Sequence, residues 1–408
     1  MVDEPSNLAE AVADAVDPEE VITFTRSLIA ARSENPGGTE DEAADVAASI
    51  LRGLGADPTI VRSEAGRPSV VAAIGDGGRP HLAWNGHLDV VPAGSPDTWA
   101  TDPWAGAILD GRLVGRGSAD MKGPIGAALA AAAALVRSGV ERRGTLVFHL
   151  AADEELAGIH GTKVLWERGL LDQDACIVGE PSELQLGLAE RGGAWFTATA
   201  YGKAAHGSQP HRGVNAITSM ARFLLRLPEV LPDREHPLTG RPTVNAALIT
   251  GGSAPNVVPD RCQVDIDRRI SPGEIDPEQV RAPFLALVAD LQRNHPELEI
   301  DVELREWTDA AEASPDTEIV RIARDAVAAQ TGSPPALVGF TGITDARFYI
   351  NQAEIPTVIL GPGSLTVAHT AGESIDVDEL VAGARSYARI FATFLAPEPG
   401  RSWWRGYP

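Results

Sequence analysis

Residues 145–158 read TLVFHLAADEELAG, in which an apolar run leads directly into three carboxylates. The run has the length and composition of a buried β-strand, and Asp153, Glu154 and Glu155 follow it on one loop. Like charges packed this closely are costly unless a cation compensates them, so the stretch favours a metal site. A solvated acidic loop is the alternative explanation.

Helices and short apolar strands alternate on both sides of this stretch. Such alternation is the pattern of an α/β layered domain. The periodicity predicts helices over residues 19–31, 39–54, 124–138 and 317–330, and strands over residues 69–74, 81–85, 145–151, 175–178 and 357–360.

The pattern changes from about residue 192 onwards. Strand, helix, strand, strand, helix and strand now follow one another, which is the order of the ferredoxin-like α+β unit. The strands are predicted over residues 195–201, 243–250, 261–270 and 298–305, and the helices over residues 214–227 and 278–294. The 408 residues are therefore expected to form a discontinuous first domain, residues 1–190 and 307–408, interrupted by a second domain, residues 191–306.

The composition excludes several classes of partner. With 57 acidic and 34 basic side chains the net charge is −23, so we expect neither nucleic acid nor an anionic membrane surface as a partner. Cys176 and Cys262 are too few for a disulfide framework. Residues 1–20 lack the segments of a signal peptide, and the apolar stretch 123–136 is shorter than the roughly 20 residues of a bilayer span. We therefore expect a cytoplasmic protein.

The segment WNGHLDVVPAG, residues 84–94, brings His87 and Asp89 to the C-terminal end of a predicted strand. Open α/β sheets have their ligand sites at these ends. Side chains two apart on a strand share a face, so we expect the Asp89 carboxylate to hydrogen-bond the His87 imidazole and fix its tautomer. A structural histidine beside a turn is the alternative.

Three more segments add two carboxylates and an imidazole. Asp120 lies in a glycine-rich turn before the alanine-rich helix, Glu180 follows a predicted strand, and His369 lies in a glycine-rich loop. A helix cap is the alternative role for Asp120. Together, two imidazoles and several carboxylates at strand ends suit a pair of divalent ions that share one bridging carboxylate.

Over nearly its whole length the chain resembles the di-zinc peptidase and amidohydrolase family that includes acetylornithine deacetylase, succinyl-diaminopimelate desuccinylase, aminoacylase and carboxypeptidase G. The motifs that carry the resemblance are GHLDVVP, GRGSADMKG, ADEE, GEPS, AHGSQPHRGVNA, NVVPD and the terminal GPG with AHT. The resemblance implies an α/β fold: a three-layer, zinc-exopeptidase-like catalytic domain with an inserted ferredoxin-like α+β domain that serves as lid and dimerisation domain.

The resemblance also implies a set of metal ligands. The cofactors would be two divalent ions, zinc first, with cobalt or manganese as alternatives. His87 and Glu180 would hold one ion, Glu155 and His369 the other, and Asp120 both, with a cis peptide bond between Asp120 and Met121.

Further residues acquire roles by the same resemblance. Glu154 looks like the general base that activates a zinc-bridging hydroxide, and Asp89 like the partner that orients His87. His206 aligns with a histidine that stabilises the oxyanion in a neighbouring subunit's active site, which implies a homodimer through the inserted domain. A surface-loop histidine is the alternative.

The substrate is less constrained than the reaction. The implied substrate-binding residues are Asn245, Arg269, Thr344 and Gly363. For Arg269, an exposed ion pair with Asp267 is the alternative, and for Thr344 a turn hydrogen bond.

Glu190 and Gly193 stand where the desuccinylase branch is expected to carry an arginine and a serine. The sequence therefore favours hydrolysis of an N-acyl amino acid, as in acetylornithine deacetylase. The alternatives are a dipeptidase or carboxypeptidase, a succinyl-diaminopimelate desuccinylase, and, more remotely, a non-catalytic protein that binds a metal or a small molecule. Glu154 argues against the last, because binding alone needs no general base.

Overall fold

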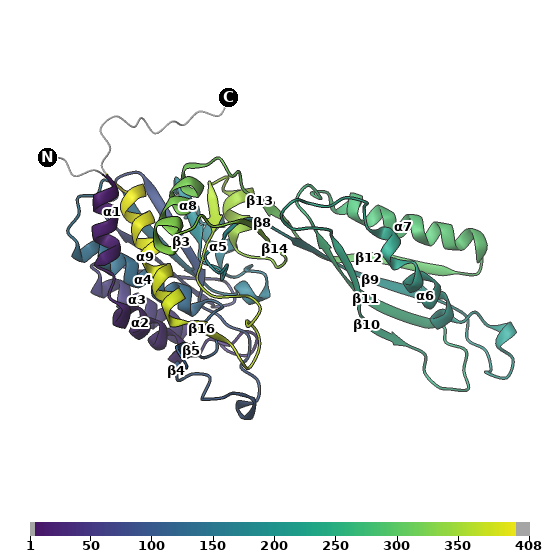
Figure 1. Cartoon of the computed structure of the whole chain (residues 1–408). Helices are drawn as coiled ribbons and strands as arrows, with labels where there is room; N and C mark the ends of the chain where they lie inside the picture. The colour runs from purple at the N-terminus through teal and green to yellow at the C-terminus, as the bar shows by residue number, and fades with distance from the viewer. Residues whose placement is uncertain (1–4, 397–408) are drawn as a thin grey trace. The chain divides into compact units, whose positions relative to one another are not determined.

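The structure, a computed structural model, describes residues 5–396 and divides into two compact units (Figure 1). Unit 1 comprises Met1–Leu188, Ala313–Val338 and Thr344–Pro408, and unit 2 comprises Ala189–Glu312 and Gly339–Ile343.

Unit 1 is built on a mixed sheet with the strand order β1-β2-β6-β3-β7-β15-β8. Strand β3 runs parallel to β6 and β7, and β15 runs parallel to β7, whereas β2 is antiparallel to β6. The strands are β1 Thr59–Arg62, β2 Pro68–Ile74, β3 His81–His87, β6 Thr145–Ala151, β7 Ala175–Val178, β8 Leu186–Glu190, β14 Leu337–Phe340 and β15 Thr357–Ile359. All residues of β6, β7 and β15 are buried, as expected for strands covered on both faces.

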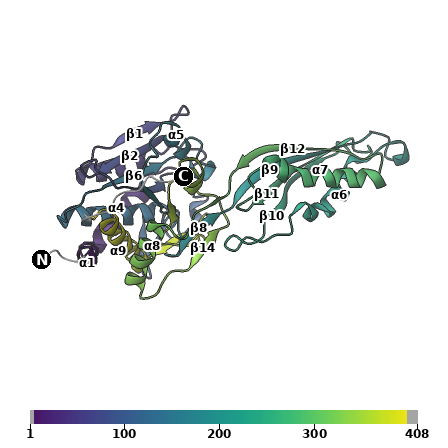
Figure 2. The same ribbon diagram turned by 90° about the horizontal axis from the view of Figure 1, so that it is seen from above.

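Seven α-helices belong to the described part of unit 1. They are α1 Pro5–Asp14, α2 Pro18–Ala30, α3 Asp41–Gly53, α4 Lys122–Arg137, α5 Thr162–Glu167, α8 Glu318–Thr331 and α9 Val377–Phe394. Helix α4 contacts both α2 and α9 and also contacts β3, so the alanine-rich sequence forms the centre of this layer. Figures 1 and 2 show α4 beside α9. A small sheet of β16 Ser374–Asp376, β5 Arg112–Val114 and β4 Ala107–Leu109 completes the unit.

Small residues in α4 allow its backbone to approach α2 closely. A Cβ atom built on Gly126 would lie 2.1 Å from Thr25 Oγ1 and 2.8 Å from Thr25 N. Any residue other than glycine would therefore require the α2 backbone to move. Because α4 starts two residues after Asp120, this contact also fixes the turn that carries that carboxylate.

Unit 2 has the strand order β10-β11-β9-β12, with every neighbouring pair antiparallel. Its elements follow the chain as β9 Gly192–Tyr201, α6 Ala216–Leu225, β10 Thr243–Gly251, β11 Arg261–Ile270, α7 Pro277–Asn294 and β12 Glu299–Thr308. This is the ferredoxin-like arrangement predicted from the sequence. Helices α6 and α7 cover one face of the sheet and enclose a separate core that includes Phe196, Phe223 and Phe284 (Figure 1).

The bounds of unit 2 differ from the expected residues 191–306. Strand β12 continues to Thr308, and β13, Ala311–Glu312, then pairs with Ala189 and Glu190, so the unit extends to residue 312. The segment 339–343 also joins it, because the Arg191 main-chain nitrogen donates to Phe340 O (3.1 Å). Within residues 5–396, no helix is long and apolar enough to cross a membrane.

Candidate metal centre and active site

Strand β3 ends at His87, which is almost completely buried. Its Nδ1 atom donates to the main-chain oxygen of Asp89 (2.9 Å), and this bond directs Nε2 toward Asp120. The carboxylate bond expected from the sequence is therefore replaced by a carbonyl bond, since Asp89 Oδ1 lies 3.6 Å from Nδ1. The ring is oriented as predicted, but by a different atom of the same residue.

The Asp89 carboxylate has another task. It accepts the main-chain N–H groups of Glu154 (3.0 Å) and Glu155 (3.2 Å), and the side-chain amide of Asn35 (2.9 Å). Asp89 thus connects the strand end that carries His87 with the loop after β6.

Asp120 lies just before α4, and its peptide bond to Met121 is cis, as the resemblance implies. Each of its carboxylate oxygens faces one imidazole. His87 Nε2 lies 3.0 Å from Oδ1, and His369 Nε2 lies 3.3 Å from Oδ2. A carboxylate placed between two imidazoles in this way has the geometry of a bridging ligand.

Glu154 and Glu155 lie in a single turn of 3₁₀-helix, η2 Glu154–Leu156, directly after β6. The flanking residues Asp153 (φ +65°) and Ala157 (φ +73°) both have left-handed backbones, which turns the loop sharply. Glu155 Oε2 consequently lies 3.0 Å from His369 Nε2, and Glu154 Oε2 lies 3.8 Å from His87 Nε2.

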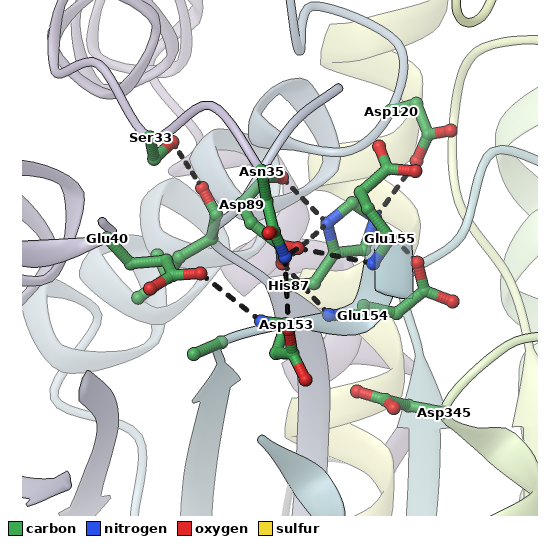
Figure 3. A network of polar contacts seen from close by, with 12 residues as sticks. Ser33, Asn35, Glu40, His87, Asp89, Asp120, Asp153, Glu154, Glu155 and Asp345 are labelled. Atoms are coloured by element: carbon green, nitrogen blue, oxygen red, sulfur yellow. Dashed lines mark hydrogen bonds and ion pairs between the residues drawn. The ribbon is translucent and has the colours of Figure 1, made fainter. Parts of the chain in front are cut away.

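Asp153, the third carboxylate of this loop, joins the same polar network through Asn35 and, within residues 5–396, makes no ion pair with either imidazole of the cluster (Figure 3). Asn35 lies between it and Asp89, and the Asn35 amide nitrogen donates to both carboxylates (3.1 and 2.9 Å). Arg67 Nε donates to Glu40 Oε1 (2.9 Å), which also accepts the Asp153 N–H (3.3 Å). The sequence analysis missed Asn35, Glu40 and Arg67, because short loop motifs do not reveal which polar side chains become buried.

Glu180 follows β7, and its Oε1 atom lies 3.8 Å from His87 Nε2. That oxygen is buried and has no hydrogen-bond partner among the described residues. The ligand atoms of His87, Asp120 and Glu155 lie within 4.8 Å of one another, and so do those of His87, Glu154 and Glu180. The structure therefore brings all five expected metal ligands and Glu154 into one cluster.

Burial and neighbouring charges shift several pKa values within the cluster. Hydrogen bonds to Asp120 and Glu155 raise the pKa of His369 to about 10. Burial raises the pKa of the Glu154 carboxyl well above its usual range, and the Glu180 carboxylate raises it further. Burial opposes ionisation of Asp120, but His369 and His87 hold its pKa below the ordinary value.

The donor set fits divalent ions. Four carboxylates around two imidazoles are a concentration of negative charge that a buried site does not retain without counter-charge, and two divalent cations would supply it. Glu180 Oε1, which accepts no hydrogen bond from the described residues, is available to bind a cation. Imidazole and carboxylate are suitable ligands for zinc, and they also bind cobalt and manganese. The site is accordingly a candidate metal centre.

One further residue was expected to stabilise the oxyanion and four to bind the substrate, and these five residues belong to both units. His206, in unit 2, is exposed, and its Nδ1 atom lies 2.8 Å from Ser208 Oγ. Asn245 on β10 is opposite Asp267 on β11, and Arg269 Nε lies 3.0 Å from Asp267 Oδ1, so the expected alternative ion pair is present.

Thr344 and Gly363 belong to unit 1. Thr344 is buried, and its hydroxyl accepts the Ala346 N–H (3.1 Å), which is the turn hydrogen bond named above as its alternative role. Gly363 has φ +97°, and its N–H donates to Glu379 Oε1 (2.9 Å).

The curated proteins to which the chain is similar include a deacetylase and a desuccinylase. The chain is 34% identical over 326 residues to acetylornithine deacetylase of Myxococcus xanthus, covering 78% of this chain and 81% of the relative. It is 30% identical over 388 residues to succinyl-diaminopimelate desuccinylase of Phenylobacterium zucineum, covering 92% of this chain and 99% of the relative.

Several solved structures share the fold, among them two peptidases. Human carnosine dipeptidase 1 matches with a TM-score of 0.74 at 19% identity, over 95% of this chain and 99% of that one. A dinuclear metal-binding peptidase of the M20 family from Bacillus subtilis matches with a TM-score of 0.69 at 18% identity, over 93% and 98%. The model of peptidase family M20/M25/M40 matches residues 83–393, which include every residue of the metal cluster. The chain is thus a member of peptidase family M20/M25/M40, a family of metal-dependent hydrolases of amide and peptide bonds.

Proposed function

We propose that this hydrolase cleaves the amide bond of an N-acyl amino acid, in the manner of an acetylornithine deacetylase. The observation that carries the proposal is the cluster of two imidazoles and three carboxylates with Glu154 at its edge. The similarity to the Myxococcus xanthus deacetylase supports the choice of acyl group.

In this proposal, His87, Asp120, Glu155, Glu180 and His369 hold two divalent ions, zinc first. The ions would supply positive charge that polarises the amide carbonyl and acidifies a water molecule. Glu154 takes a proton from the attacking water and returns it to the leaving amine. Asp89 holds the main chain of Glu154 and Glu155 while its carbonyl orients His87. Asn245, Arg269, Thr344 and Gly363 are the proposed substrate contacts.

A second candidate is hydrolysis of succinyl-diaminopimelate, because the desuccinylase of Phenylobacterium zucineum matches 92% of this chain. Glu190 argues against desuccinylase activity. This residue is a fully buried carboxylate, whereas the desuccinylase branch is expected to carry an arginine at its position. Cleavage of a dipeptide or of a C-terminal residue is a third candidate, supported by the fold shared with a dipeptidase.

A screen of N-acetyl, N-succinyl and dipeptide substrates on one zinc-loaded preparation separates these candidates. We expect the highest kcat/KM for an N-acetyl amino acid, and a preference for succinylated or peptide substrates would overturn the assignment. Chelation should abolish activity, and zinc, cobalt or manganese should restore it.

The Glu154→Gln variant tests the catalytic role directly. Loss of the general base should lower kcat by about 10² to 10⁴, with two metal ions still bound. Glu167→Gln is a matched control, because Glu167 is an exposed carboxylate whose partner is Lys163. Unchanged hydrolysis by metal-loaded Glu154→Gln would exclude Glu154 as the base.

We also propose that the protein is a cytoplasmic homodimer joined through unit 2, in which His206 serves the partner's active site. The exposed strand β10 and the exposed His206 support this arrangement. Mixing His206→Ala subunits with Glu154→Gln subunits is the test. In heterodimers one site regains both groups, so activity should reappear on mixing. Two inactive variants that stay inactive when heterodimers are present would contradict action in trans.

A further inference from the structure

Glu373 is a buried carboxylate that the proposed catalytic chemistry does not use. It lies four residues after His369, on the same loop, and is 0% exposed. Its Oε1 atom accepts the main-chain N–H groups of Ala119 (3.0 Å) and Asp120 (3.1 Å), and Arg116 donates to its Oε2 atom. A single side chain on the His369 loop thus binds the turn that carries Asp120.

The neighbouring strands make this contact a fixed one. Antiparallel pairing of β16 with β5 sets the two segments in register, from Ser374 opposite Val114 to Asp376 opposite Arg112. Just beyond the ladder, the Gly115 N–H donates to Glu373 O (3.2 Å). The two strands are thus held together by the sheet, and beyond its end the Glu373 side chain holds the His369 loop to the turn that carries Asp120.

The buried Glu373 carboxylate has a buried cation, Arg116, as its partner. The guanidinium carbon of Arg116 lies 5.3 Å from the centre of the Trp99 ring. A buried ion pair of this kind is weak support for stability, because desolvation offsets most of the attraction. Its geometric effect is specific, because the two N–H bonds fix the main chain at the residue whose carboxylate faces both imidazoles.

We propose that Glu373 is a positioning residue that holds the Asp120 turn against the His369 loop, so that one carboxylate meets two imidazoles. The inference rests on the proposed function in so far as Asp120 and His369 are metal ligands. Hydrogen-bond partners behind the ligands typically change metal affinity by about 10- to 100-fold when they are removed.

The test compares cobalt binding by the wild type and by Glu373→Ala, Glu373→Gln and Glu274→Gln. Glutamine keeps an oxygen that accepts the two N–H groups, whereas alanine removes the acceptor. Glu274 is the matched control, because it is a largely buried carboxylate that accepts from Arg268 and from the Ser271 N–H (2.8 Å) in unit 2. The readouts are Co²⁺ affinity, the visible Co²⁺ spectrum and the melting temperature of the metal-free protein.

We expect Glu373→Ala to bind at least one Co²⁺ ion about 10- to 100-fold more weakly with an altered spectrum, and Glu373→Gln to lie between it and the wild type. Glu274→Gln should lower the melting temperature of the metal-free protein and leave the Co²⁺ affinity and spectrum unchanged. If Glu373→Ala does not fold, the comparison of Glu373→Gln with Glu274→Gln decides. Wild-type affinity and spectrum in the Glu373 variants, or an equal loss in Glu274→Gln, would overturn the inference. A wild type that binds two Co²⁺ ions but hydrolyses no substrate would overturn only the proposed function.

Discussion

Burial and neighbouring carboxylates shift the pKa values of two histidines in opposite directions. His149 lies within β6, and burial lowers its pKa to about 4. His369 faces two carboxylates, and its pKa is raised to about 10. The first imidazole is therefore neutral at pH 7, whereas the second is protonated at that pH.

His149 gives a prediction for stability against pH. Its pKa falls from 6.5 in the unfolded chain to about 4 in the folded one, so stability is fully present above pH 6.5 and decreases as the pH falls toward 4. From pH 7.5 to pH 5 this loss is about 2 kcal/mol. His149→Gln removes the titrating group, so denaturant unfolding should show a smaller pH dependence in the variant. Equal pH dependence in both proteins would contradict a neutral, buried imidazole.

For single residues, the sequence predicted which side chains form the cluster, but not which atoms form its hydrogen bonds. His87 and Glu180 were expected at strand ends and Asp120 in a turn before a helix, and the structure brings these residues together. The tautomer of His87 depends on the Asp89 carbonyl, and a main-chain contact of this kind leaves no trace in residue types. Glu373 acts through main-chain N–H groups as well, and for the same reason it was missed.

Among the elements, helix α4 packs closely on its neighbours because most of its residues are alanine or glycine. Its alanines and glycines allow contact with both α2 and α9, and its N-terminus follows the Asp120 turn. Packing of this helix therefore affects both stability and the position of a proposed ligand.

Gly126→Ala should destabilise the protein by at least about 1–3 kcal/mol, the usual effect of overpacking, because the added Cβ would overlap Thr25. Denaturant unfolding measures the effect. Gly53→Ala is the control, since Gly53 is in α3 with no atom within 4 Å of an added Cβ, and it should be neutral or stabilising by up to about 1 kcal/mol. Similar effects of both substitutions would contradict the close approach of α2 and α4.

The long elements were largely predictable from their periodicity, as β6 and β11 show by matching their expected bounds. Helix α9 was missed although Leu380, Ala384, Tyr387 and Phe391 have helical spacing. Strand β8 was missed for a physical reason. It has five residues, and its neighbour β15 lies far along the chain, so no local pattern identifies it.

The whole molecule consists of two units with separate cores, and unit 2 encloses its own apolar cluster. The candidate metal centre belongs to unit 1 alone. Scanning calorimetry should therefore resolve two transitions, of which only one responds to metal. Free zinc at 100 times its dissociation constant should stabilise that transition by about 2.7 kcal/mol.

Chelation should then lower the midpoint of the unit 1 transition and leave the unit 2 transition unchanged. The control is Glu274→Gln, which should shift only the unit 2 transition, because Glu274 and its partner Arg268 belong to that unit. A single transition that moves as a whole with metal would contradict independent units.

Strand β15 has a consequence for the order in which the protein is completed during biosynthesis. It lies between β7 and β8, yet residues 189–312 of unit 2 are translated before it. A nascent chain on the ribosome can close unit 2 except for residues 339–343, while the sheet of unit 1 still has a gap and His369 has not been made. The cluster can assemble fully only after residue 369 has been translated, so a chain that stops before His369 cannot carry the full candidate metal centre.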